Sequence, residues 1–315
     1  MIAVHHLLID SVSWHILLED LQKAVEGYGN GRNADLSLKT ASFQQWAEAL
    51  EAYAHSSAPE KEIPYWKTVS ESIWDSKLLL NGNGTGEGKS VQIALTPTET
   101  EQLLTEACNT YHTQINDLLL AALALAVREY TGQRQVAICL EGHGREPIHV
   151  PLDIDRTIGW FTCAYPVILK CTDDIAEAII ETKELLRRIP NHGIGFGLLY
   201  DPAELDHVGV FFNYIGSSEE SDKVGATSAD ENAVGGPVNI NGGIFDGSLC
   251  FSVAPGRGWT PAIDVSELGQ LYHKSLLRVL DHCISSEESY MTYGDVDADD
   301  LEEADYDEIS ALLGL

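Results

Sequence analysis

A carboxylate and a pair of histidines stand where short apolar runs of the chain end. Glu141 directly follows the apolar run 136–140 and opens the string Glu-Gly-His-Gly-Arg-Glu. His5 and His6 likewise follow a short apolar run that we expect to be a strand. Two polar clusters at strand ends suggest one site. A histidine and a glutamate in one site form a pair of proton-transfer groups, so the sequence predicts chemistry in which a proton is removed and returned.

Two other kinds of site are disfavoured by residue spacing. Zinc ligands on a helix lie three or four residues apart, whereas His5 and His6 are adjacent, and no Cys-x-x-Cys pair accompanies them. The run Gly193-x-Gly195-x-Gly197 lacks the strand–turn–helix frame and the following acidic residue of a dinucleotide-binding loop. We therefore expect this chain itself to bind neither a metal nor a cofactor.

Apolar residues at regular intervals predict the elements that position these groups. Helical spacing begins at Ser13, so a helix is expected to leave the histidine pair directly. Ser42 is a candidate N-cap of the next helix. The expected helices are 13–25, 43–53, 98–111 and 115–130, and the expected strands are 91–95 and 136–140. This alternation continues along the chain and favours an α/β layer architecture.

The composition of the chain limits which partners the protein can bind and indicates the cellular compartment in which it works. The 315 residues include 49 acidic and 19 basic side chains, a formal net charge of −30. Nucleic acid and anionic membrane both need a basic face, so neither is an expected partner. The longest apolar stretch, 118–127, is too short to span a bilayer. Six scattered cysteines and the lack of a signal peptide predict a cytoplasmic protein.

Three stretches are expected to be connections or tails. Residues 81–88 alternate glycine with other small or polar residues, which predicts a flexible linker. Residues 216–237, rich in Ser, Glu, Asp and Gly, predict a surface loop. The acidic end, 299–315, has apolar residues on one helical face and predicts a short helix that either packs back on the protein or docks onto another chain.

Six short strings of residues stand out along the chain. They span residues 5–14, 116–123, 141–146, 153–166, 193–200 and 212–216. In order and spacing they resemble the epimerization domain of non-ribosomal peptide synthetases, and the resemblance covers nearly the whole chain. The related condensation domains share the His-His-x-x-x-Asp string but not the Glu-Gly-His-Gly-Arg-Glu and Gly-Trp-Phe-Thr strings. The resemblance therefore favours epimerization within the superfamily.

The resemblance also implies a fold. It is the chloramphenicol-acetyltransferase-like α/β fold, in which two similar lobes meet. In the family most of an N-terminal lobe precedes the His-His string. We therefore expect residues 1–80 to be a remnant of that lobe, with the first lobe truncated, and residues 89–315 to be the C-terminal lobe. Ser11 stands where the family usually has glycine, which predicts a stiffer loop after the histidines.

The implied substrate is an aminoacyl or peptidyl thioester on the phosphopantetheine arm of a peptidyl carrier protein. Adjacent or downstream synthetase modules are further implied partners. Glu141 is the expected base for the Cα proton, and His6 is expected to stabilise the enolate or to act as the acid. Which group serves which face stays open. Two alternatives also stay open, namely an inactive fragment that only docks a carrier protein and a condensation domain that forms peptide bonds.

The remaining site residues carry weaker expectations. Asn213 and Tyr214 are expected either to reach the thioester or enolate oxygen or to pack within a strand. Asp10 is expected to order its loop through a salt bridge with Arg145 or Arg156. The residues expected to be structural at the site are His5, Asp10, Arg145, Arg156, Trp160 and Tyr165. Of these, His5 is expected to point away from the substrate and Trp160 to pack at the wall of the channel.

Overall fold

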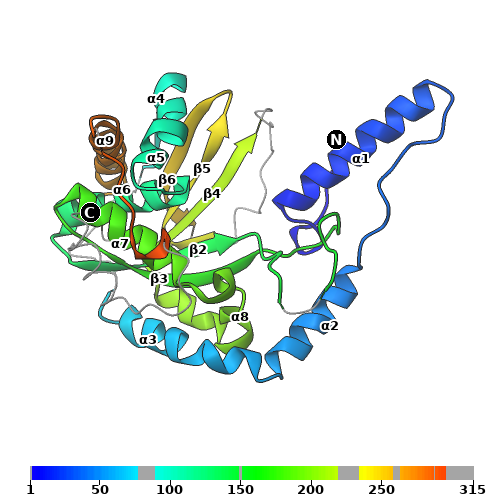
Figure 1. Ribbon diagram of the computed structural model, residues 1–315, viewed down its shortest axis with the longest axis horizontal. Coiled ribbons are helices and arrows are strands. Elements are labelled where there is room, and N and C mark those ends of the chain that lie inside the picture. Colours follow the sequence, from blue (N-terminus) through cyan, green and yellow to red (C-terminus); the bar gives the residue numbers. More distant parts are fainter. Residues whose placement is uncertain are drawn as a thin grey trace. The chain divides into compact units, whose positions relative to one another are not determined.

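A six-stranded mixed sheet organises most of the chain in the computed structural model (Figure 1). Its strand order is β1-β6-β5-β4-β2-β3. Strand β2 pairs with β4 in parallel and β4 with β5 in parallel, whereas β5–β6 and β6–β1 are antiparallel. The strands are β1 (Val91–Ala94), β2 (Gln135–Gly142), β3 (Cys163–Lys170), β4 (Val210–Ser218), β5 (Val234–Phe245) and β6 (Ser248–Arg257). The mixed sheet confirms the expected α/β architecture.

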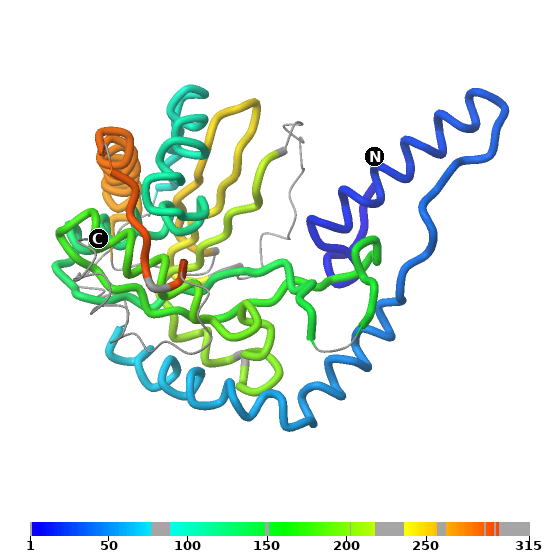
Figure 2. Tube along the Cα trace, in the orientation of Figure 1, coloured from blue at the N-terminus to red at the C-terminus, as the bar shows by residue number. Residues whose placement is uncertain are grey.

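The structure describes residues 2–76, 89–148, 151–218, 234–257, 263–286 and 288–295 (Figure 2). They form two units, which are described separately below. Unit 1 comprises Met1–Thr68, Glu141–Tyr165 and Pro190–Glu204. Unit 2 comprises Val69–Leu140, Pro166–Ile189 and Leu205–Leu315. The expected linker 81–88 and the expected helix 299–315 lie outside the described residues, and so does most of the expected loop 216–237.

Helices of unit 2 gather on one face of the sheet (Figure 1). Helix α6 is buried from Asp117 to Val127 and packs against α7 and α9, and α9 also packs against β1 and β6. Gly132 ends α6 in the left-handed conformation that glycine adopts without strain. The helices are α4 (Pro97–Gln102), which continues as a π-helical turn (Leu103–Ala107) into α5 (Cys108–Thr110), then α6 (Ile115–Thr131), α7 (Ile175–Arg187) and α9 (Val265–Ile284).

Unit 1 is built from helices and loops around a small apolar core. Its core side chains are Trp46, Ala49, Tyr53, Ile148, Ile154, Phe161 and Ile194. The helices are α1 (Ser11–Gly29), α2 (Phe43–Ala54) and α8 (Phe196–Leu199), and α3 (Ile63–Ile73) begins in this unit. Figure 2 shows the segment that follows β2 running beside the N-terminal segment. Residues more than 130 positions apart in the sequence thus form one body.

Most of the expected elements are confirmed, with one correction. Helix α2 begins after Ser42, which forms a reciprocal capping box with Gln45. The strand expected before the histidines was wrong. Residues 2–5 have no regular structure, and His6–Leu8 is a 3-10 helix. A strand needs a partner to satisfy its backbone groups, and none of the strands in the described part of the chain pairs with this segment.

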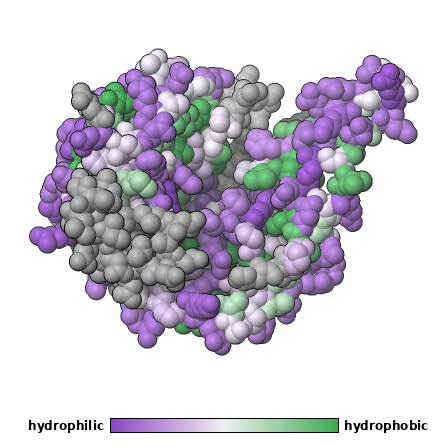
Figure 3. Space-filling model, in the orientation of Figure 1, coloured by the Kyte–Doolittle hydropathy of each residue, from purple (hydrophilic) through white to green (hydrophobic). Residues whose placement is uncertain are grey.

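Helix α1 carries an exposed apolar face. Leu18, Leu21, Val25 and Tyr28 recur at intervals of three and four residues, so they share one side of the helix, and all are exposed. Figure 3 shows further apolar atoms at the surface around the N-terminal segment and between α1 and α2. The opposite side is held by polar contacts, because Arg156 pairs with Glu19 and Asp20. Helix α1 is therefore anchored to unit 1 through charge as well as packing.

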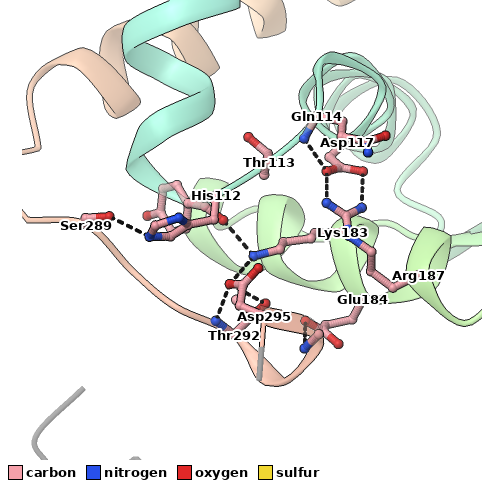
Figure 4. Close-up of polar contacts among 12 residues, drawn as sticks. His112, Thr113, Gln114, Asp117, Lys183, Glu184, Arg187, Ser289, Thr292 and Asp295 are labelled. Carbon is pink, nitrogen blue, oxygen red and sulfur yellow. Dashed lines mark hydrogen bonds and ion pairs between the residues drawn. The ribbon is translucent and has the colours of Figure 1, made fainter. Parts of the chain in front are cut away.

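A buried ammonium group holds the segment 288–295 in unit 2 (Figure 4). The Lys183 side chain is fully buried on α7, pairs with Asp295 and donates a hydrogen bond to the Tyr111 carbonyl (2.7 Å). Burial alone would raise the pKa of Asp295, but the hydrogen bonds from Lys183 and from the Thr292 amide outweigh it and lower that pKa. A buried charge is costly unless it is paired.

We predict that Asp295→Ala destabilises unit 2 by about 3 to 5 kcal/mol, because it leaves the Lys183 ammonium buried without its counter-ion. Chemical denaturation measures the change. Lys183→Met combined with Asp295→Leu is expected to recover part of the loss. Asp173→Asn, which removes the exposed partner of Arg128, is the control and is expected to change little. Equal effects of Asp295→Ala and Asp173→Asn would contradict the prediction.

Candidate active site

The loop that carries the two histidines is fixed by one buried carboxylate. Asp10 is the N-cap of α1, and its Oδ1 accepts a hydrogen bond from the Ser13 amide (2.7 Å). Its Oδ2 accepts one from the Phe161 amide (3.1 Å). Asp10 thus caps the helix and also binds the segment 157–161.

Arg145 is the partner of Asp10, with Nη2 to Oδ1 at 3.3 Å. Of the two arginines expected for this role, the structure therefore selects Arg145, while Arg156 binds α1. Nη2 also donates to Ser13 Oγ (2.9 Å), and the guanidinium lies 3.8 Å from the centre of the Phe161 ring. Burial lowers the pKa of Arg145, and Asp10 opposes that shift. The string that begins at Glu141 is thereby tied to the histidine loop.

Arg145 also satisfies backbone carbonyls of the connecting segment. Nη1 donates to Ile154 O and to Thr157 O, both at 2.9 Å. A planar guanidinium offers several donors in fixed directions, so one side chain sets the course of residues 154–157.

His6 has a fixed ring orientation. Its Nδ1 lies 2.9 Å from the Ile9 carbonyl oxygen, which can only accept. Nδ1 therefore carries a proton, and Nε2 is the nitrogen that accepts a proton or, in the imidazolium, donates one. The Trp160 ring lies against the imidazole, with centroids 5.5 Å apart. His5 is turned to its own backbone, where Nδ1 accepts from the Leu7 amide (3.2 Å).

Glu141 is the second-last residue of β2, so the strand expected over 136–140 extends two residues beyond that range. Burial raises the pKa of Glu141, and the charge of His6 opposes this shift. The two groups thus interact electrostatically within unit 1. A carboxylate with a raised pKa is a stronger base than an ordinary glutamate.

Two glycines in the string that begins at Glu141 lie in tight surroundings, and space excludes a side chain at Gly144. Gly144 has a φ of +64°, and a Cβ there would lie 1.7 Å from the Phe161 carbonyl oxygen. A Cβ on Gly142 would lie 3.1 Å from Cys163 Sγ. Burial raises the pKa of Cys163 to about 11, so its thiol stays protonated near neutral pH and is not a nucleophile.

His143, between these glycines, faces a carboxylate. Its Nδ1 accepts from the Arg145 amide (3.0 Å), so a neutral ring carries its proton on Nε2, which lies 3.1 Å from Glu146 Oε1. His192 approaches the other Glu146 oxygen at 3.9 Å. These contacts join the loop 190–193 to the end of β2.

The other residues expected at the site fall into two groups. Tyr165 is buried in unit 1, packs edge-on against Trp66 (6.2 Å between centroids) and fills the space that Gly193 leaves. Asn213 and Tyr214 belong to unit 2, on β4, where Tyr214 packs near Phe251 (6.4 Å). Burial raises the pKa of Tyr214. That Asn213 and Tyr214 reach the thioester or enolate oxygen of the substrate stays a prediction.

Sequence reasoning missed two supports of the site. Ser13 Oγ donates to the Gly159 carbonyl (2.9 Å) and accepts from the Gly159 amide (3.1 Å). Ser13 stood within the histidine string, but its type alone did not indicate these partners. Glu62 is buried and accepts hydrogen bonds from Tyr53, Trp66 Nε1 (3.0 Å) and Asn191 Nδ2 (2.8 Å). Nothing in the sequence marked Glu62. Among the described residues, no group of His, Cys, Asp or Glu side chains is arranged to hold a metal ion.

The comparisons with known proteins show the family. The family model described as "Condensation domain" matches residues 1–301, so the chain belongs to the condensation-domain family. It is 35% identical over 338 residues to surfactin synthase subunit 1 of Bacillus subtilis (strain 168), covering 99% of this chain and 9% of that protein. It is 36% identical over 330 residues to bacitracin synthase 2 of Bacillus licheniformis, covering 98% of this chain and 13% of that protein. The chain thus spans only a small part of the length of these relatives.

Solved structures agree with this assignment. The epimerization domain from the third module of tyrocidine synthetase B matches with a TM-score of 0.80 and 34% identity, over 90% of this chain and 69% of that one. The first condensation domain of the calcium-dependent antibiotic synthetase matches with a TM-score of 0.68 and 17% identity, over 90% and 64%, which shows the fold alone. The expected chloramphenicol-acetyltransferase-like α/β fold is confirmed. None of the described helices has the length and apolar character needed to cross a membrane.

We predict that Arg145→Met destabilises unit 1 by about 3 to 5 kcal/mol, because it leaves the buried Asp10 carboxylate without its cation. Thermal and chemical denaturation measure the loss. Arg156→Met, which removes only partly exposed ion pairs on α1, is the matched control and is expected to change stability much less. If the two variants unfold alike, Arg145 does not hold the site together.

Proposed function

We propose that this chain is the epimerization domain of a non-ribosomal peptide synthetase and inverts the Cα configuration of an aminoacyl or peptidyl thioester. The observation that carries the proposal is that Glu141, at the end of β2, and His6 belong to the same unit, where the Asp10–Arg145 pair ties their two segments together. The 34% identity to a tyrocidine epimerization domain supports it. The Glu-Gly-His-Gly-Arg-Glu string also favours epimerization over condensation.

In the proposed reaction the Glu141 carboxylate takes the Cα proton. The electron pair of the broken Cα–H bond is delocalised into the thioester carbonyl as an enolate, and a proton returned to the opposite face restores the Cα–H bond. The thioester bond stays intact throughout. Only proton transfer and charge stabilisation are needed, which are the two tasks that a carboxylate and an imidazole perform.

His6 suits the second task because of its tautomer. With Nδ1 committed to the Ile9 carbonyl, the imidazolium presents its other N–H through Nε2. That N–H can donate to the enolate oxygen or supply the returning proton. Asn213 and Tyr214 are proposed to assist at the carbonyl oxygen. The substrate is proposed to arrive on the phosphopantetheine arm of a peptidyl carrier protein, with adjacent or downstream synthetase modules as further partners.

We predict that the protein exchanges the Cα proton of carrier-bound aminoacyl thioesters with solvent and forms both isomers. Incubation in heavy water with a panel of L- and D-aminoacyl carrier proteins, followed by mass spectrometry and chiral analysis, measures both. Glu141→Gln is expected to lower exchange by at least about 10²-fold, because an amide cannot accept the proton. Glu129→Gln on the surface of α6 makes the same chemical change and is expected to leave exchange unchanged.

The same assay assigns the faces and tests the proposal. Loss of exchange from the L-thioester but not from the D-thioester in Glu141→Gln would assign Glu141 to the L face. No deuterium uptake by the folded wild-type protein across the panel would contradict the proposed function.

We predict that the rate of Cα-proton exchange rises with pH on the acidic side of the pH–rate profile, as the Glu141 carboxyl group ionises. Only the ionised carboxylate can accept the Cα proton, and burial raises the pKa of Glu141 above its ordinary value of about 4.5. As the pH falls, exchange is therefore expected to decline at a higher pH than it would if the base were a glutamate with an ordinary pKa. The rate of single-turnover exchange, measured as a function of pH, tests this dependence. A rate that stays constant down to pH 4.5 in folded protein would mean that Glu141 is not the base.

A condensation domain is the second candidate, favoured by the family model that matches residues 1–301. It would join two carrier-bound substrates, with attack by an amine on a thioester and loss of the thiol. Supplying two differently loaded carrier proteins distinguishes the reactions, because condensation yields a dipeptidyl thioester whereas epimerization yields only the inverted monomer.

A further inference from the structure

Trp160 lies on a backbone segment of unit 1 that is held by hydrogen bonds on both sides. The Gly159 carbonyl accepts hydrogen bonds from the Asp10 amide (3.1 Å) and from Ser13 Oγ (2.9 Å). On the other side, the Phe161 amide donates to Asp10 Oδ2 (3.1 Å), and the Phe161 ring is buried. Both neighbours of Trp160 are thus bonded to the loop that follows the histidines.

Sterics allow this segment little adjustment. A Cβ on Gly159 would lie 2.2 Å from the Phe43 ring, so the backbone before Trp160 is packed directly against α2. Phe43 in turn packs edge-on against Phe161, with centroids 5.1 Å apart. The position of the Trp160 backbone relative to the histidine loop is therefore set by hydrogen bonds and by close packing together.

The Trp160 side chain itself is not part of the core. Its exposed fraction is 41%, whereas that of Phe161 is 5%. The indole ring lies against the His6 imidazole, with centroids 5.5 Å apart and planes inclined by 37°. A large aromatic ring that is held out of the core by a rigid backbone contributes less to stability than a buried one, so packing alone does not account for its placement.

The contact limits how the His6 ring can turn. The indole ring blocks rotation of the imidazole on one side, while the hydrogen bond from Nδ1 to Ile9 fixes the ring edge. Together the two contacts restrict the orientation of the His6 imidazole.

We propose that Trp160 is a positioning residue that orients the His6 imidazole; this rests on the proposed function of His6 in proton transfer. Trp160 acts through His6 and needs no contact with the substrate. The expectation from sequence, that Trp160 only packs at the wall of the channel, makes a different prediction, since a wall residue acts on substrate binding and independently of His6.

The test compares Trp160→Leu, which removes the π face but keeps an apolar side chain, with Trp160→Phe, which retains an aromatic ring. Trp160→Leu is expected to lower kcat for Cα exchange by about tenfold with KM changed by less than about twofold, and Trp160→Phe to stay within about threefold of wild type. Ile158→Ala is the matched control, since Ile158 is an equally exposed side chain of the same segment, and no change is expected. A rise in KM at constant kcat would support the wall role and overturn the proposal.

A double-mutant cycle decides whether the effect passes through His6. In a His6→Gln background, where slow exchange is followed over long incubation, Trp160→Leu is expected to have no further effect. The same tenfold loss in both backgrounds would overturn the proposal.

A spectroscopic measurement separates this proposal from the proposed function. The His6 ring protons are expected to show a ring-current shift that Trp160→Leu abolishes, and ¹⁵N resonances are expected to show protonated Nδ1 in wild type and a mixture of tautomers in the variant. If the wild-type protein exchanges no Cα proton, the proposed function fails, but the His6 resonances still report on positioning. Unchanged His6 resonances in Trp160→Leu would overturn the proposal whatever the activity.

Discussion

The buried pair of Asp10 and Arg145 is the interaction on which the rest of unit 1 depends. The two residues are 135 positions apart, and each also satisfies backbone groups of other segments. Taking both charges out of water is costly, and only well-directed hydrogen bonds offset that cost. Apolar packing would tolerate small shifts between the segments. We interpret the pair as the device that fixes the register between the histidine loop and the string that begins at Glu141.

That register determines the electrostatics of the candidate site. Glu141 and His6 interact only because their segments are held side by side, and the two effects on Glu141 oppose each other. Burial raises the pKa of the carboxylate and so makes it a stronger base, while the charge of His6 lowers that pKa. Moving His6 away would leave the carboxylate with the raised pKa alone and so favour its protonated, inactive form. The geometry that supports the site therefore also tunes its protonation.

The sequence predicted individual helices and strands well, but it predicted strand pairing and side-chain partners between distant segments poorly. The helix after Ser42 and the strand β2 follow from capping chemistry and apolar periodicity, which are local. The segment before the histidines was predicted wrongly as a strand, because pairing depends on a partner that the local pattern does not specify. From the sequence alone, Arg145 and Arg156 were both possible salt-bridge partners of Asp10. Only the folded chain shows that Arg145 is buried beside Asp10 and that Arg156 reaches Glu19.

Different residues of the string that begins at Glu141 have structural and proposed chemical roles. A mutation in this string must therefore be interpreted according to the residue that it changes. Gly144 allows the close approach of Phe161, and Arg145 anchors the histidine loop. Substituting either one disturbs the frame as well as the chemistry, so a loss of activity there would not identify a proton-transfer group. The hydrogen bonds that build the Asp10–Arg145 frame are made by residues other than Glu141. Replacing this carboxylate with its amide counterpart removes none of these three hydrogen bonds, so a defect in that variant does not arise from their loss.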